Sequence, residues 1–140
     1  VMTRATDRLL AAPGVKTADE LRARVDVAGA ANADIFVSIH ANAHPTKPET
    51  AGAITFRYPG CSYDLAATVQ EALVEETGAV DKGVRNANFY VLRHSAIPAV
   101  LVETGFLSNR AEAARLADKG YQNDVANGLF KGIVRYFLSL

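Results

Sequence analysis

Two short segments hold the residues best suited to chemistry. His40 lies in Ser38-Ile39-His40-Ala41-Asn42-Ala43, and Glu103 opens the segment Glu103-Thr104-Gly105-Phe106-Leu107-Ser108-Asn109. Neutral imidazole is the commonest side-chain metal ligand, and a carboxylate at the end of an apolar strand is desolvated, which raises its pKa toward the range useful for acid-base catalysis. The pair predicts a metal ligand beside a general base. Each residue alone could equally have a structural role, as a hydrogen-bonded histidine at a strand end or as a carboxylate that caps the following turn.

The elements that must position these two side chains are buried strands. Apolar runs at residues 34–39 and 99–102 end next to His40 and Glu103. In open α/β sheets, ligand sites form outside the carboxyl ends of parallel strands. We therefore expect both side chains to face one crevice.

The rest of the sequence predicts alternating strands and helices. Thr17 and Glu20 have capping-box spacing, Gly78 ends a helical pattern, and Asn109 with Glu112 marks another helix start. Pro45 and Pro48 interrupt regular structure, which predicts a loop over residues 44–51. This alternation indicates a layered α/β fold. The predicted helices cover residues 18–31, 63–77 and 121–138, and the predicted strands cover residues 1–4, 34–39, 52–58, 88–92 and 96–102.

Composition narrows the classes of function. The 140 residues fit one domain, and fifteen scattered Lys and Arg residues balance fifteen Asp and Glu residues, which argues against nucleic-acid binding. No apolar stretch approaches the roughly 18 residues that span a bilayer, so we expect no membrane insertion. Cys61 is the single cysteine, which excludes a disulfide within the chain and a thiolate cluster.

Other polar residues are weaker candidates. His44 stands four residues after His40, but its strand-to-loop context does not form a helical ligand pair, and His94 is expected to be a polar loop residue. Arg85 and Arg93 could bind a carboxylate, although solvated or ion-paired arginines are commoner. Cys61 lies in a turn signal and is expected to be a bystander.

Four ordered motifs together resemble one family. They are the Ser38 to Ala43 segment, Gly83-Val84-Arg85 leading into Asn88-Phe89-Tyr90-Val91-Leu92-Arg93, Pro98-Ala99-Val100-Leu101-Val102-Glu103, and Gly105-Phe106-Leu107-Ser108-Asn109. The chain is similar to the zinc-dependent N-acetylmuramoyl-L-alanine amidases of the bacterial cell wall, in their amidase-3 branch, from Val1 almost to the C terminus.

The resemblance implies a three-layer α/β/α domain with a mixed, mostly parallel sheet. It also implies hydrolysis of the amide between N-acetylmuramic acid and the L-alanine of the stem peptide. In that family two histidines and a glutamate hold zinc, and a further glutamate acts in catalysis. His40 matches the second histidine ligand and Glu103 the catalytic glutamate. Asn42 and Arg85 are expected to contact peptidoglycan, the substrate.

The family's first histidine and its glutamate ligand have no counterpart in residues 1–140. We expect them upstream of Val1, in a strand-and-helix unit of roughly 30 residues, so that residues 1–140 form a single but N-terminally incomplete catalytic domain. An extracytoplasmic location follows from the substrate, with wall-binding or activator domains as further partners. Two alternatives stay open: a catalytically inactive peptidoglycan-binding or regulatory module, and a different metallohydrolase such as a peptidase.

Overall fold

The computed structural model describes residues 1–3, 10 and 16–140. In this part of the chain, helices and strands alternate as the sequence predicts, and the predicted loop over residues 44–51 contains neither. The elements, in order, are α1 (Thr17–Ala30), β1 (Phe36–Asn42), β2 (Ala53–Arg57), α2 (Tyr63–Thr77), β3 (Asp81–Asn86), α3 (Tyr90–Arg93), β4 (Ala99–Phe106), α4 (Arg110–Ala117) and α5 (Lys119–Leu138).

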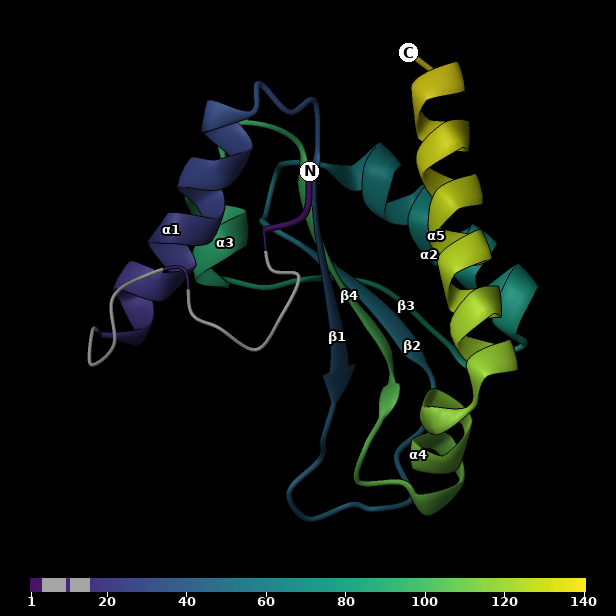
Figure 1. Ribbon diagram of the computed structural model, residues 1–140. Helices are drawn as coiled ribbons and strands as arrows, with labels where there is room; N and C mark the ends of the chain where they lie inside the picture. Colours follow the sequence, from purple (N-terminus) through teal and green to yellow (C-terminus); the bar gives the residue numbers. More distant parts are fainter. Residues whose placement is uncertain (4–9, 11–15) are drawn as a thin grey trace.

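The described strands form a mixed sheet in the order β1-β4-β2-β3. β1 pairs with β4 and β2 pairs with β3 in parallel, whereas β2 and β4 are antiparallel. Figure 1 shows α1 and α3 on one side of the sheet and α2 and α5 on the other. The expected three-layer α/β/α architecture with a mixed, mostly parallel sheet is confirmed.

Each face of the sheet has its own core. Leu65, Val69 and Leu73 of α2 pack with Val100 and Val102 of β4 on one side. On the other side, the α1 and α3 layer covers Phe36, Ala99 and Leu101. Because both faces of β4 are covered, every one of its residues is buried, which explains why this strand reads as a continuous apolar run.

The prediction for residues 88–92 is wrong. Residues 90–93 form the short helix α3, and the strand of this region is β3, which lies earlier at Asp81–Asn86. β3 pairs only with β2 in the described sheet, and such an outer strand can be polar. Val91 and Leu92 instead fill the core between α3 and the sheet.

Two further boundaries differ from the sequence prediction. Thr17 is not the cap of α1: the cap position is Lys16 and has no side-chain hydrogen bond, while the Glu20 carboxylate pairs with Arg24. Residues 1–3 are not in a strand, and Arg4, the end of the predicted first strand, lies outside the described residues.

The Asn109 cap is confirmed, because its side chain accepts hydrogen bonds from the amides of Ala111 and Glu112.

Among the described residues, no helix is long and apolar enough to cross a membrane.

Close contact between α2 and α5 generates the first testable prediction. A methyl group on Gly132 of α5 would lie 2.6 Å from Cα of Val69, whereas one on Gly29 of α1 would have no neighbour within 4 Å. We expect Gly132→Ala to lower the free energy of unfolding by about 1–3 kcal/mol through overpacking. The matched control Gly29→Ala should raise it by about 0.5–1 kcal/mol, because alanine favours the helix. Urea denaturation measures both, and an unchanged Gly132→Ala midpoint would contradict the close packing.

Candidate active site

The pairing of β1 with β4 brings the two predicted site residues together. His40 and Glu103 are register partners on these parallel strands. Partners in register project to the same face of a sheet, here the face covered by α1 and α3, to which Phe36 and Leu101 of the same strands also contribute. The predicted meeting of the two strand ends is therefore present in the backbone.

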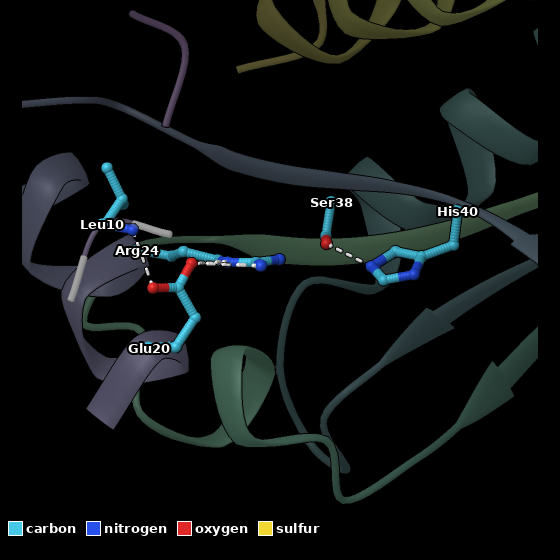
Figure 2. Close-up of polar contacts among 5 residues, drawn as sticks. All are labelled: Leu10, Glu20, Arg24, Ser38 and His40. Carbon is cyan, nitrogen blue, oxygen red and sulfur yellow. Dashed lines mark hydrogen bonds and ion pairs between the residues drawn. The ribbon is translucent and has the colours of Figure 1, made fainter. Parts of the chain in front are cut away.

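His40 is oriented by its own strand. Its Nε2 lies 2.9 Å from the Ser38 hydroxyl oxygen, and among the described residues its Nδ1 has no hydrogen bond. Figure 2 shows this contact, with Arg24 of α1 extending toward it. Partial burial lowers the pKa of His40, and the positive charge of Arg24 lowers it further. The ring is thus held in the neutral form that binds metal ions.

Glu103 is a buried carboxylate with unused hydrogen-bonding capacity. Its residue is only 9% exposed, and its Oε2 is buried without a hydrogen-bond partner in the described part of the chain. Burial raises the pKa of Glu103 above its ordinary value. A carboxylate in this condition is a stronger base than one in water, which suits proton transfer near neutral pH.

A cavity of about 1290 Å³ lies along β1, and Arg24, Ser38 and His40 are among the residues that line it. The Arg24 guanidinium is held by Glu20, whose Oε1 accepts hydrogen bonds from Nε and Nη2, both at 3.3 Å. The other Glu20 oxygen accepts the Leu10 amide at 2.8 Å (Figure 2). The positive charge of Arg24 therefore lies in the lining of the same cavity as His40.

Four hydrogen bonds join the segment around the end of β4 to β1 and its following loop. The Thr104 hydroxyl donates to the His40 carbonyl at 3.0 Å, and the Leu107 amide donates to the Asn42 carbonyl at 2.7 Å. Ser108 accepts the His44 amide at 2.9 Å, and Asn109 donates to the Glu49 carbonyl at 3.3 Å. The small polar residues of the Glu103 to Asn109 motif therefore hold the two site segments together, a role that sequence reasoning missed.

The two expected substrate-binding residues lie in different places. Asn42 ends β1 close to the site, and its side-chain oxygen accepts the Ala43 amide at 2.7 Å. Arg85 lies on β3 in register with Phe56, hence on the same sheet face as Glu103. However, it lies two strands away, or about 10 Å by strand spacing alone. Arg85 is exposed and is not brought to His40.

The weaker candidates have local structural contacts. The Nδ1 of His44 accepts the Thr46 and Lys47 amides within its own loop. His94 stacks on Tyr90 with ring centroids 4.0 Å apart. Cys61 is an exposed free cysteine.

The described residues do not by themselves complete a zinc site. Catalytic zinc ordinarily takes three protein ligands and water, but residues 1–3, 10 and 16–140 contain no group of three or more His, Cys, Asp or Glu side chains placed to hold a metal ion. His40 can supply one neutral nitrogen, and any further ligands would come from elsewhere.

Comparisons with known proteins agree on one family. Residues 1–135 match the Amidase_3 family, described as N-acetylmuramoyl-L-alanine amidase. The chain is 39% identical over 121 residues to the amidase LytC of Bacillus subtilis, covering 84% of this chain and 24% of LytC. It is 36% identical to the germination-specific amidase of the same organism, covering 98% of this chain and 61% of that protein. It thus spans a quarter to three-fifths of these relatives.

Solved structures show the same likeness. The catalytic domain of CwlV from Bacillus (Paenibacillus) polymyxa superposes with a TM-score of 0.87 at 38% identity, covering 98% of this chain and 71% of that one. The CwlD amidase of Clostridioides difficile, solved in complex with the GerS lipoprotein, superposes with a TM-score of 0.90 at 31% identity, covering all of this chain and 76% of CwlD.

The buried carboxyl of Glu103 generates a prediction about stability and pH. Because its pKa is raised in the folded state, folding carries a cost that is absent below the ordinary glutamate pKa and grows as the pH rises through the raised value. In metal-free protein, Glu103→Gln should therefore be more stable than the parent, and this advantage should increase as the pH rises from acid to neutral. Urea denaturation across this range measures the difference, and a gain that shrinks with rising pH would contradict the raised pKa.

Proposed function

This chain belongs to the Amidase_3 family, and we propose from that membership that it hydrolyses the amide bond between N-acetylmuramic acid and the L-alanine of the peptidoglycan stem peptide. One observation carries the chemistry: a buried carboxylate oxygen of Glu103, without a hydrogen-bond partner among the described residues, lies on a strand in register with His40. This arrangement supports a general base at Glu103 and a metal-binding nitrogen at His40.

In this proposal Glu103 moves the proton. Its carboxylate accepts a proton from the attacking water while the water oxygen bonds to the scissile carbonyl carbon. It then delivers that proton to the amide nitrogen as the carbon–nitrogen bond breaks. The products are a muramic acid carboxylate and a free L-alanine amine. Asn42, beside the site, and Arg85, farther along the same face, are proposed to contact the glycan or the peptide.

Zinc is the proposed cofactor, with His40 as one ligand and the others supplied by residues outside the described part of the chain. When bound, zinc would polarise the scissile carbonyl and make its water more acidic. Support comes from the neutral His40 ring, because its lowered pKa keeps a nitrogen lone pair available.

The substrate places the reaction in the cell wall, so we propose an extracytoplasmic location. Relatives whose names include the cell wall, such as a cell wall amidase of Bacillus anthracis that is 36% identical over 133 residues, support this setting. Wall-binding or activator domains are proposed as further partners. In one relative, the CwlD amidase, the solved structure contains a second protein, the GerS lipoprotein.

The role of Glu103 is tested by Glu103→Gln in the naturally occurring protein, with any residues that flank this chain. Removing a general base should lower hydrolysis by about 10²–10⁴-fold, while zinc content and peptidoglycan binding stay unchanged. Release of L-alanine amino groups from peptidoglycan measures the reaction. Glu76→Gln, which removes a partly exposed carboxylate paired with Lys131, is the matched control. Unimpaired release by Glu103→Gln would refute this role.

The metal proposal is tested by His40→Ala in the same protein, measured by elemental analysis. We expect about one zinc per parent chain and a large loss in the variant, because a tetrahedral site loses one of its protein ligands. Equal zinc in both would remove His40 from the ligand set. A parent that binds peptidoglycan but holds no zinc and releases no amino groups would instead support the inactive wall-binding module.

A further inference from the structure

A second buried carboxylate, that of Glu112, lies near the site. Glu112 of α4 is 6% exposed. Its Oε2 accepts the Phe106 amide at 2.7 Å and its Oε1 accepts the Gly52 amide at 2.8 Å, and both hydrogen bonds are buried. Hydrogen bonds to an ionised group are roughly twice as strong as neutral ones. Each carboxylate oxygen therefore binds a different strand segment.

Capping of α4 does not explain this arrangement. A glutamate at this position of a capping box reaches back to the amide of the cap residue. Here the cap residue Asn109 donates its amide to the Phe106 carbonyl at 3.0 Å, and its own side chain already accepts the amides of Ala111 and Glu112. The Glu112 carboxylate reaches past the helix end to the sheet.

Both amides that Glu112 holds lie just beyond Glu103, toward the C-terminal end of β4. Phe106 ends β4, three residues beyond Glu103. Gly52 immediately precedes β2, and Ile54 of β2 is the antiparallel register partner of Glu103. One carboxylate thus joins the strand that carries Glu103 to the strand that pairs with it, at the end of the sheet where His40 lies.

The neighbouring glycines leave little freedom for this junction to shift. Gly52 has φ +111°, and a Cβ there would lie 2.3 Å from the Val80 carbonyl oxygen. A Cβ on Gly105 would lie 3.4 Å from the Glu112 carboxylate and 3.3 Å from Leu116. The backbone on both sides is therefore closely packed, and each of the two segments carries an amide that the Glu112 carboxylate binds.

We propose that Glu112 is a positioning residue: by binding the Phe106 and Gly52 amides it sets the register of β4 against β2, and with it the placement of the Glu103 carboxylate. This inference rests on the proposed amidase function. It gives Glu112 an effect on turnover that is separate from its contribution to stability.

The test uses Glu112→Gln in the naturally occurring protein, with a soluble muramoyl-peptide as substrate. Glutamine keeps the shape of the side chain but replaces one accepting oxygen with an NH2 group, which then faces a backbone N–H group. We therefore expect kcat to fall at least tenfold, with KM and zinc content within twofold of the parent. Assays run well below the unfolding temperature. Glu76→Gln controls for loss of a carboxylate, and Gly132→Ala for loss of stability away from the site.

Three results would overturn the proposal. They are an unchanged kcat in Glu112→Gln, a kcat loss no larger than that of a Gly132→Ala variant of similar stability, and a kcat loss that follows loss of zinc. If Glu112→Gln does not fold by near-UV circular dichroism, Glu112→Asp, which keeps the charge but is one methylene shorter, is tested by the same criteria. An inactive parent would refute the proposed function itself, which separates the two failures.

Discussion

The parallel pairing of β1 with β4 is the constraint on which the rest of the site depends. It places His40 and Glu103 in register and on one face of the sheet. The pairing is enforced by burial, because helices cover both faces of β4 and all of its residues are buried. A slip of one residue would move each side chain of β4 to the opposite face, so that Glu103 would enter the core on the other side of the sheet. The positions of His40 and Glu103 at the strand ends are thus fixed by packing in the interior.

Polar contacts also join the ends of β1 and β4. Thr104 binds the His40 carbonyl and Ser108 binds the His44 amide, so the segment at the end of β4 supports the segment at the end of β1. The residues that follow Glu103 thereby keep two distant stretches of chain together.

The two buried carboxylates near this edge have opposite environments. Glu112 accepts a hydrogen bond from a backbone amide on each carboxylate oxygen, so both of its oxygens have a partner within the fold. Glu103 is equally buried, but one of its oxygens has no partner in the described residues, and its pKa is raised. An unsatisfied buried polar group costs stability, and such costs are typical of functional sites. The contrast distinguishes a carboxylate whose oxygens both bind the backbone from the one that we propose as the general base.

The sequence by itself determined the α/β alternation and the bounds of α2, and it predicted that His40 and Glu103 lie together at strand ends, because hydrophobic periodicity and an ionisable residue after an apolar run are local signals. It misplaced β3, since an outer strand needs no apolar pattern. Only the tertiary structure decided where Arg85 and Glu112 lie relative to this pair. Arg85 lies two strands from Glu103, and the Glu112 carboxylate binds Gly52, 60 residues away in sequence. Strand order and long-range hydrogen bonds arise from packing between distant segments, which no local pattern encodes.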